Sequence, residues 1–432
     1  MEGFCVHGGE KLQGEIPVPT AKNAVLPIMA AAILARDPVT LHACPDISDV
    51  RAMGEIIEKL GCRCDGGPEE IRIHNQGLSN WEMPDALSRQ IRSSIFLLGP
   101  ILAKLRRATV SYPGGCEIGL RPIDLHLKGL RALGVRVIDE GGRLYCDGRE
   151  MHAGDVYFDY PSVGATENVM MAAALLPGVT VIHNAAREPE IEDLQRFINA
   201  LGGRVWGAGT QVIQVEGVPQ LHGGEYTPIP DRIAAGTFLC AGAMTGGSVT
   251  LRRACLYDLL PVTEKLKEMG CRVWGEADRI ALQAPARLRA FSQLQTQPHP
   301  GFPTDMQSPI MAAACVAEGT SVVIENVFEN RFGQAADLRR MGADIRISGR
   351  MAVIQGAAEL HGARVRARDL RGGAALVLAG LAARGDTVIE NIGLIDRGYP
   401  RLEETIAALG GRMERMILSE QTEVQHVAAA AP

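Results

Sequence analysis

Apolar and polar residues follow a pattern that returns six times along the chain. In each return, an amphipathic helical stretch ends in Leu-Gly or Met-Gly and a β-rich run follows. The six stretches are 55–64, 128–137, 196–205, 264–273, 336–345 and 404–413. Glycine just after the last periodic residue is the usual left-handed end of a helix, and a recurrence about every 70 residues predicts a repeat architecture. The glycines are Gly61, Gly134, Gly202, Gly270, Gly342 and Gly410.

A second, more apolar helix is predicted before each of these stretches. The six begin at Lys22, Arg92, Gly164, Ile233, Asp305 and Arg371. Because they are apolar nearly all round, we expect them to be buried on most sides. Each is followed by a short β-rich run such as TVIHNA or TVIENI. One unit therefore comprises an apolar helix, a strand, a loop, an amphipathic helix and a strand, and six units group as three plus three.

Prolines interrupt the pattern between 225 and 232 and indicate a domain boundary. We therefore predict an α/β (α+β) protein of two domains, one made of 1–21 plus 230–420 and the other of 22–229. The opening strand, in FCVHGGEKLQGEIPVP, precedes the first helix and is expected to pair elsewhere and close the second domain. Residues 421–432 have no periodicity and are predicted to form a disordered tail.

Bulk composition narrows the classes of function. The 432 residues carry a net charge of −6, so nucleic acid is a poor candidate partner. A run of about 18 uncharged apolar residues is missing from the sequence, which argues against a membrane span. The N-terminus does not have the pattern of a secretory signal, and the ten cysteines are scattered without paired C-x-x-C motifs. These features predict a reducing cytoplasm, no metal site and mostly buried, unpaired thiols.

Unusual polar residues recur at two positions of the repeat. One set lies at the starts of the apolar helices: Lys22, Asn23, Arg92, Ser162 to Gly164, Arg232, Thr304, Asp305 and Arg371. The other lies in the loop before the amphipathic helix: Cys116, Arg121, Arg187, Glu188, Arg331 and Arg397. If the units are pseudo-symmetric, each domain collects both sets at one end, where helix N-termini and cations form an anion site. The implied ligand is small and polyanionic, with phosphate and carboxylate groups.

Each of these residues, taken alone, also has a plainer explanation. An arginine that opens a helix is often just solvated, and an aspartate such as Asp305 commonly caps a helix. Arg331, in FENRF, fits a structural ion pair. The stretch YPGGCEIGLR leaves Cys116 open as a packing residue, a redox thiol, a metal ligand or an acid–base group. The functional interpretation rests on the shared position in the repeat.

Seven long stretches stand in order along the chain. They are KLQGEIPVPTAKNAVLPIMAAAILA, PGGCEIGLRPIDLHLKGLRALG, SVGATENVMMAAALL, NAAREPEIEDL, PHPGFPTDMQ, VFENRF and IDRGYPRLEE. Together they resemble the UDP-N-acetylglucosamine enolpyruvyl transferases (UDP-N-acetylglucosamine 1-carboxyvinyltransferases), over almost the whole chain. The resemblance implies a two-domain inside-out α/β barrel, with helices inside, sheets outside and a cleft between the domains that closes on both substrates.

The resemblance also implies a reaction. The enolpyruvyl group of phosphoenolpyruvate passes to the 3-hydroxyl of UDP-N-acetylglucosamine, and phosphate leaves, by addition and elimination through a tetrahedral ketal. This is the first committed step of peptidoglycan synthesis, so the resemblance implies a bacterial, cytoplasmic enzyme with a part in cell shape and division and with sensitivity to fosfomycin. It implies no cofactor, no partner beyond the two substrates, and a monomer or weak oligomer.

Residue roles follow from the same resemblance. The implied catalytic residues are Asp305 as the base at the sugar hydroxyl, Cys116 as the proton donor, and Lys22 and Arg397 at the phosphate and carboxylate. The implied binding residues are Arg121, Arg92, Arg331 and Arg371 for the anionic groups, Asn23 and the Val327 backbone for the sugar, Arg121, Pro122, Ile123, Asp124 and Leu125 for the uracil, and Ser162, Val163 and Gly164 for the diphosphate. Tyr160 and Pro161 stand where some members carry a lysine, so backbone amides would do more at the diphosphate.

Two alternatives stay open at this stage. One is 5-enolpyruvylshikimate-3-phosphate synthase, which shares the fold and the carboxyvinyl transfer. RQIRSSI stands at 89–95 where that enzyme has a G-N-A-G-T helix start, which argues against it. The other is a non-catalytic or secondary paralogue, against which the intact Lys22, Cys116, Asp305 and Arg397 argue.

Overall fold

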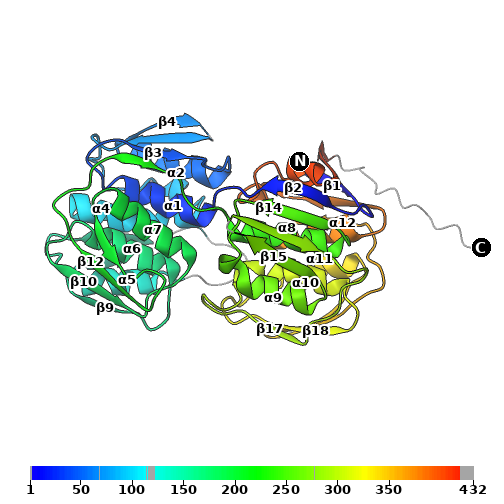
Figure 1. Cartoon of the computed structure of the whole chain (residues 1–432). Coiled ribbons are helices and arrows are strands. Elements are labelled where there is room, and N and C mark those ends of the chain that lie inside the picture. The colour runs from blue at the N-terminus through cyan, green and yellow to red at the C-terminus, as the bar shows by residue number, and fades with distance from the viewer. Residues whose placement is uncertain (1, 68, 113, 115–121, 277, 419–432) are drawn as a thin grey trace, which may run out of the picture. The chain divides into compact units, whose positions relative to one another are not determined.

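The computed structural model describes residues 2–67, 69–112, 114, 122–276 and 278–418. This part of the chain divides into two compact units, unit 1 and unit 2 (Figure 1). Among the described residues, unit 1 contains those up to Pro19 and from Pro230 onward, and unit 2 contains those of 20–114 and 122–229. The predicted tail at 421–432 lies outside the described residues.

Apolar helical segments form the interior of unit 2. They are α1 (Lys22–Ala32), η1 (Arg92–Leu97) continued by α4 (Leu98–Leu105), and α6 (Val163–Ala173). Because these segments have almost no polar face, nearly all of their side chains are buried. Amphipathic helices flank them: α2 (Ser48–Lys59), α5 (Asp124–Ala132) and α7 (Pro189–Ala200), with a short α3 (Asp85–Ser88).

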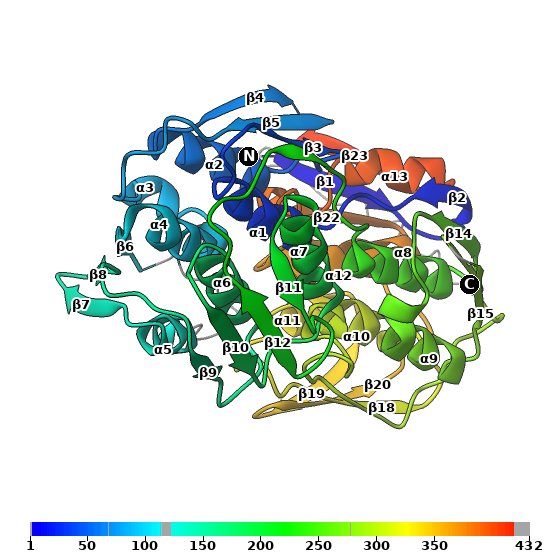
Figure 2. The ribbon, with the colours of Figure 1, turned by 60° about the vertical axis from the view of Figure 1, so that its left-hand side comes forward.

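Sheets cover the outside of the unit 2 helices (Figures 1 and 2). The strands, in sheet order, are β13 (Gly224–Tyr226), β3 (Val39–His42), β5 (Glu70–His74) and β4 (Arg63–Gly67) in one sheet; β6 (Arg107–Ser111), β8 (Arg143–Asp147) and β7 (Arg136–Glu140) in a second; and β11 (Arg204–Trp206), β12 (Val212–Glu216), β10 (Val179–His183) and β9 (Asp155–Tyr157) in a third. The β3, β8, β10 and β12 strands alternate buried and more exposed residues, as expected for a sheet with one face on the core.

Unit 1 repeats this plan with its own helices. The apolar segments are α8 (Arg232–Met244), η3 (Thr304–Met306) continued by α10 (Gln307–Cys315), and α12 (Leu370–Ala382). The amphipathic helices are α9 (Leu260–Glu268), preceded by η2 (Tyr257–Leu259), α11 (Ala335–Arg340) and α13 (Leu402–Ala408); η4 (Ile392–Leu394) lies between α12 and α13 in sequence. The α8, α10 and α12 helices pack against one another in the interior.

The sheets of unit 1 are again outside its helices (Figure 2). In sheet order, the strands are β15 (Arg272–Glu276), β16 (Arg279–Gln283), β14 (Ser248–Arg252) and β2 (Gln13–Pro17); β17 (Gln293–Gln295), β18 (Thr320–Ile324), β20 (Met351–Gln355) and β19 (Asp344–Ser348); and β21 (Arg364–Arg366), β22 (Asp386–Glu390), β1 (Glu2–His7) and β23 (Arg412–Ile417). The two-domain, inside-out α/β fold expected from the resemblance is therefore confirmed, and each unit has a hydrophobic core of its own.

The glycines that end the amphipathic helices adopt the predicted conformation. All six have φ between 81° and 103°, the left-handed region that favours glycine. The repeat differs from the prediction in one respect, because an antiparallel pair of strands, not a single strand, follows most of these helices. Between β7 and β8 the turn residues are Gly141 and Gly142, both with positive φ, which is the chemistry of a tight hairpin turn.

The prediction that the opening strand closes the second domain is confirmed. The β1 strand pairs antiparallel with β22 on one side and β23 on the other. The last repeat supplies β23 but no hairpin partner within the described residues, and β1 takes that place (Figure 2). No helix of the described chain is long and apolar enough to cross a membrane.

Candidate functional site

Asp305 is held between two buried arginines in unit 1. Arg331 Nη2 donates to Asp305 Oδ1 at 2.7 Å, and Arg371 Nη2 donates to Oδ2 at 3.3 Å. Both arginine side chains are 3% exposed, whereas the Asp305 side chain is 28% exposed. The N-cap residue of η3 is Pro303, so Asp305 does not cap this helix. The carboxylate is therefore oriented by two buried cations and still reaches solvent.

Arg371 is fixed at the start of α12 by its own backbone and by a tyrosine. Asp369 caps the helix, and its Oδ1 accepts the Arg371 N–H at 3.0 Å. Arg371 Nη1 donates to Tyr399 Oη at 3.0 Å, and that oxygen also shares a hydrogen bond with Thr237 of α8 at 2.9 Å. The guanidinium carbon lies 5.4 Å from the centre of the Tyr399 ring, within cation–π range.

The charge of Arg371 is stabilised by its surroundings. Burial alone lowers the pKa of a guanidinium, but Tyr399, Asp305 and Asp231 outweigh burial and raise the pKa of Arg371. Asp231 caps α8, and Asp305 lies at the start of the α10 segment. Because α8, α10 and α12 pack together, the starts of all three apolar helices of unit 1 meet around Arg371. The predicted gathering of helix starts therefore exists within this unit.

Glu325 orders the turn that precedes Arg331. It is fully buried just after β18, and its Oε1 accepts hydrogen bonds from Thr296 Oγ1 and the Val327 N–H, both at 2.8 Å. Its Oε2 accepts a hydrogen bond from Thr304 Oγ1 at 2.9 Å, and Thr304 is the residue before Asp305. Sequence analysis missed Glu325, because nothing local distinguishes it from a solvated glutamate. Arg397 lies half-buried in the turn after η4, two residues before Tyr399.

Lys22 is the first residue of α1 in unit 2, where it is paired with a buried aspartate. Lys22 Nζ lies 2.6 Å from Asp49 Oδ2, and the two side chains are 13% and 3% exposed. Asp49 lies in the first turn of α2, where a negative charge also favours the helix. Asn23 follows Lys22 and is half-buried. Sequence analysis missed Asp49, because its partner Lys22 lies on a different helix, α1.

The start of α6 is closely packed against His126. Ser162 caps the helix by accepting the Ala165 N–H at 3.4 Å, and Val163 and Gly164 form its first turn. A β-carbon on Gly164 would approach His126 Cε1 to 2.9 Å, so the close packing of this imidazole requires glycine. Asn168, one turn along α6, donates to His126 Nδ1 at 2.8 Å and fixes the ring. These contacts hold the imidazole of His126 against the first turns of α6.

Other predicted residues of unit 2 also lie at element starts. Arg92 is the first residue of η1 and is half-buried. Ile123 precedes α5 and is buried, Asp124 opens that helix and is exposed, and Pro122 and Leu125 flank them. Cys116 and Arg121 lie outside the described residues, so they are not placed here.

Most cysteines in the described residues are buried and hold their protons. Burial raises the pKa of the Cys62 thiol to about 11. It raises the pKa of further thiols to about 12, those of Cys44, Cys64, Cys146, Cys271 and Cys315. These thiols are therefore inert toward alkylation near neutral pH, because the thiolate is the nucleophile.

Glu167 is a buried acid in the middle of α6. The residue is fully buried, and neither carboxylate oxygen has a hydrogen-bond partner among the described residues. Burial, followed by the charges of Glu190 and Glu188, raises the pKa of Glu167 well above its usual value. Burial therefore favours the protonated, neutral form of this carboxyl group.

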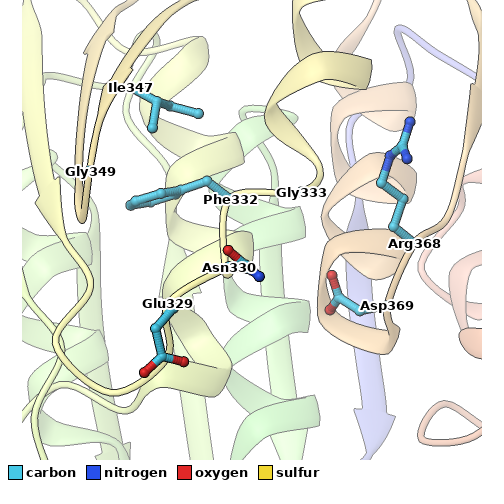
Figure 3. Close-up of a pocket in the computed structure, with 8 residues that line it drawn as sticks. All are labelled: Glu329, Asn330, Phe332, Gly333, Ile347, Gly349, Arg368 and Asp369. Atoms are coloured by element: carbon cyan, nitrogen blue, oxygen red, sulfur yellow. The ribbon is translucent and has the colours of Figure 1, made fainter. Parts of the chain in front are cut away.

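A solvent-open groove lies on unit 1 next to the Arg331 turn (Figure 3). Its volume is about 380 Å³, and it is lined by Glu329, Asn330, Phe332, Gly333, Ile347, Gly349, Arg368 and Asp369. Figure 3 shows Glu329 and Asn330 on the turn, with Arg368 and Asp369 across the groove on the segment that leads into α12. None of the site residues predicted from the sequence is among these lining residues. The groove borders the arginine cluster without containing it.

Comparisons with known proteins agree on the family. A family model described as EPSP synthase (3-phosphoshikimate 1-carboxyvinyltransferase) matches residues 6–406. Two curated relatives from Caldanaerobacter subterraneus subsp. tengcongensis, UDP-N-acetylglucosamine 1-carboxyvinyltransferases 2 and 1, are 49% and 47% identical to the chain. The matches cover 96% and 95% of this chain and 100% and 99% of theirs. UDP-N-acetylglucosamine 1-carboxyvinyltransferase 1 of Symbiobacterium thermophilum is 50% identical, over 96% of this chain and 95% of its own.

Solved structures show the same fold. The enolpyruvyl transferase NikO from Streptomyces tendae superposes with a TM-score of 0.87 at 26% identity, over 97% of this chain and 99% of its own. An EPSP synthase from Acinetobacter baumannii gives a TM-score of 0.74 at 20% identity, over 96% of this chain and 100% of its own. The second similarity concerns the fold alone.

Proposed function

Because the chain belongs to the UDP-N-acetylglucosamine 1-carboxyvinyltransferase family and carries the EPSP synthase family domain, we propose that it transfers the enolpyruvyl group of phosphoenolpyruvate to the 3-hydroxyl of UDP-N-acetylglucosamine. Phosphate is the second product. The observation that carries the proposal is the Asp305 carboxylate held by Arg331 and Arg371. The finer expectations belong to the same proposal: a place in bacterial peptidoglycan synthesis, a cytoplasmic location and inactivation by fosfomycin.

The arginine cluster suits both parts of this chemistry. A carboxylate has about four acceptor positions, so two guanidinium bonds orient Asp305 without having to saturate it. Asp305 can then accept the proton of the attacking sugar hydroxyl. Arg331 and Arg371 place two guanidinium groups beside the Asp305 carboxylate. Guanidinium groups favour the phosphate and carboxylate of phosphoenolpyruvate and the charge that develops during addition.

Unit 2 would supply the contacts to the nucleotide sugar. The N–H groups at the start of α6 carry partial positive charge, and diphosphate oxygens bind such helix starts. Gly164 lets His126 and Phe96 pack directly against this first turn. Lys22, oriented by Asp49, would add a cation for the phosphate or carboxylate of phosphoenolpyruvate. The Val327 N–H already donates to Glu325, so a sugar contact at this residue would use its carbonyl oxygen.

Phosphate release tests the activity directly. The purified protein is mixed with phosphoenolpyruvate alone, with added UDP-N-acetylglucosamine, or with added shikimate 3-phosphate. We expect release only with UDP-N-acetylglucosamine. Release with shikimate 3-phosphate instead would favour the synthase alternative, against which 45–50% identity to the UDP-N-acetylglucosamine enzymes argues. An absence of release with either acceptor would indicate a non-catalytic paralogue.

Cys116 is tested by a pair of serine variants. Cys116→Ser is expected to abolish or strongly slow turnover, whereas Cys62→Ser is expected to leave it unchanged, because the Cys62 thiol is buried and its pKa is raised to about 11. Fosfomycin should inactivate the parent protein and the Cys62 variant. Cys116→Asp should retain activity and escape fosfomycin, since aspartate can carry a proton but is not alkylated in the same way. Equal turnover of the two serine variants would remove the proposed role.

A further inference from the structure

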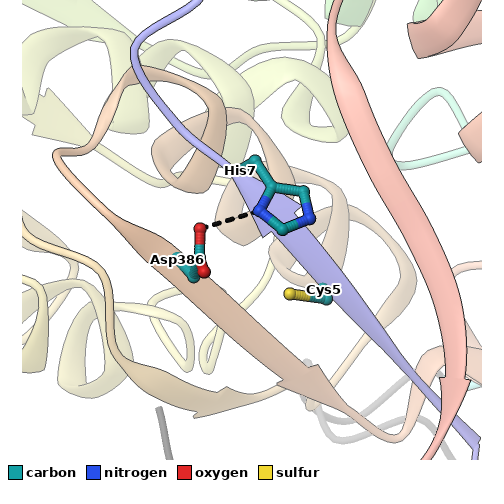
Figure 4. A group of neighbouring side chains, drawn as sticks. All are labelled: Cys5, His7 and Asp386. Carbon is teal, nitrogen blue, oxygen red and sulfur yellow. Dashed lines mark hydrogen bonds and ion pairs between the residues drawn. The ribbon is translucent and has the colours of Figure 1, made fainter. Parts of the chain in front are cut away.

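Three side chains that commonly bind metals meet on the outer face of the sheet that closes unit 1 (Figure 4). Cys5 and His7 lie two residues apart on β1, so both project from the same face of the sheet. Asp386 is the first residue of β22 and stands opposite His7 in the antiparallel register. One ligand atom from each residue, a sulfur, a ring nitrogen and a carboxylate oxygen, lies within 4.8 Å of the other two.

We propose that Cys5, His7 and Asp386 form a binding site for a divalent transition-metal ion, with Zn²⁺ as the best fit. Zinc accepts thiolate, imidazole and carboxylate ligands together, usually in tetrahedral geometry, with a water in the fourth place when the protein supplies three. Its bonds of about 2.0–2.3 Å put neighbouring ligand atoms about 3.5 Å apart. The side chains therefore need to move by only about 1 Å. Mg²⁺ and Ca²⁺ prefer all-oxygen sites, so this ligand set excludes them.

The surroundings of the three residues favour a cation. His7 Nδ1 already lies 2.8 Å from Asp386 Oδ1, and their side chains are 22% and 40% exposed, so an ion from solvent can reach them. On the other side of β1, Glu414 of β23 stands opposite Cys5 and adds a second carboxylate charge, while the exposed Arg412 stands opposite His7. The two carboxylates, Asp386 and Glu414, outnumber this one arginine. On binding, the Cys5 thiol releases its proton to solvent as the metal–sulfur bond forms. No change of oxidation state is involved.

The position of Cys5, His7 and Asp386 in the sheet indicates a structural role for the ion. His7 and Asp386 are 379 residues apart in sequence, and β1 is held at this point by main-chain pairing with β22 and β23. An ion shared by β1 and β22 would join the beginning of the chain to its last repeat. Because it binds the folded sheet and not the separated strands, it should raise the unfolding temperature.

Cobalt titration of the full-length protein tests the site. All proteins carry Cys116→Ser, so that the thiol proposed for catalysis cannot contribute, and all are first dialysed against a chelator. Co²⁺ should produce a near-ultraviolet thiolate-to-metal band and the visible bands of a tetrahedral site, saturating at one ion per chain. Zn²⁺ should displace both. Adding Cys5→Ser should remove the thiolate band and weaken metal binding by more than about tenfold. A loss of about tenfold is already usual when a residue that only supports a metal ligand is replaced.

Two further variants make the result specific. Asp386→Asn should weaken binding but keep the thiolate band at saturating metal, because the sulfur ligand remains. Cys64→Ser is the matched control, since Cys64 is also a half-buried strand cysteine, and it should bind as the parent does. An unchanged thiolate band in the Cys5 variant, or no uptake of Co²⁺ or Zn²⁺ by the parent, would overturn the proposal. So would a Zn²⁺-dependent rise in unfolding temperature that is equal in the parent and in the Asp386 variant.

Discussion

Glu167→Gln is predicted to stabilise the protein, and to do so increasingly as the pH rises. The carboxyl group is fully buried, has no hydrogen-bond partner among the described residues, and faces the charges of Glu190 and Glu188. Burial, then these two neighbours, raises its pKa well above the usual value. The folded protein therefore holds this proton over a pH range in which the unfolded chain has released it.

The size of the effect follows from proton linkage. In the unfolded chain a glutamate ionises at about pH 4.3, so below that pH both states are protonated and the group adds no pH dependence. Above it, the free energy of unfolding falls by about 1.4 kcal/mol per pH unit until the pH reaches the folded pKa. Glutamine does not titrate. The difference in free energy of unfolding between variant and parent should therefore grow by about 1.4 kcal/mol for each pH unit within this window.

Urea unfolding at a series of pH values measures this difference. The matched control is Glu325→Gln, the same substitution at an equally buried glutamate whose oxygens accept four hydrogen bonds, from Thr296, Thr304 and the backbone N–H groups of Val327 and Phe328. The control should lose stability, because an amide oxygen cannot replace two carboxylate oxygens at these donors. A Glu167 variant whose advantage does not change with pH, or that is less stable than the parent above neutral pH, would refute the reasoning.

Two other substitutions test the packing of the site. Tyr399→Phe removes the hydroxyl that accepts a bond from the buried Arg371 guanidinium, and should lower the free energy of unfolding by about 2 kcal/mol in urea titrations; an unchanged value would mean that the bond contributes nothing. Gly164→Ala forces a β-carbon to 2.9 Å from His126, and should cost about 1–3 kcal/mol and raise the KM for the nucleotide sugar. Gly54→Ala in α2 is its control, with no atom within 4 Å of the added carbon, and should instead stabilise by about 1 kcal/mol.

The repeat could be predicted because its signals are local. A glycine such as Gly61 or Gly410 ends an amphipathic helix regardless of the tertiary structure around it. The apolar helices lack a polar face, which predicts their burial directly from the sequence. The hairpins were missed because their strands are short and merge with the preceding β-rich run. The Gly141-Gly142 turn between β7 and β8 was the available signal.

The candidate site was harder to predict from the sequence, because contacts between repeats leave no pattern in the local sequence. The shared repeat position pointed to Asp305, Arg331 and Arg371, which lie together in the structure. It could not show that the two arginines hold the aspartate. The supporting residues, such as Glu325, Asp49 and Tyr399, look like ordinary surface or core residues until the helices are packed. The cluster of Cys5, His7 and Asp386 escaped for the same reason, since its third member lies hundreds of residues away.

The place of β1 between β22 and β23 affects how the chain can be made. All described residues of unit 2 lie between Thr20 and Ile229, so unit 2 can fold on the ribosome while most of unit 1 is still being synthesised. The first strand, although made before everything else, must wait for the last one, because both of its partners follow residue 385. During that delay, and in any protein shortened at its N-terminus, the inner edges of β22 and β23 are exposed. Unpaired edges of this kind recruit strands from other molecules, so the loss of a few leading residues should promote aggregation.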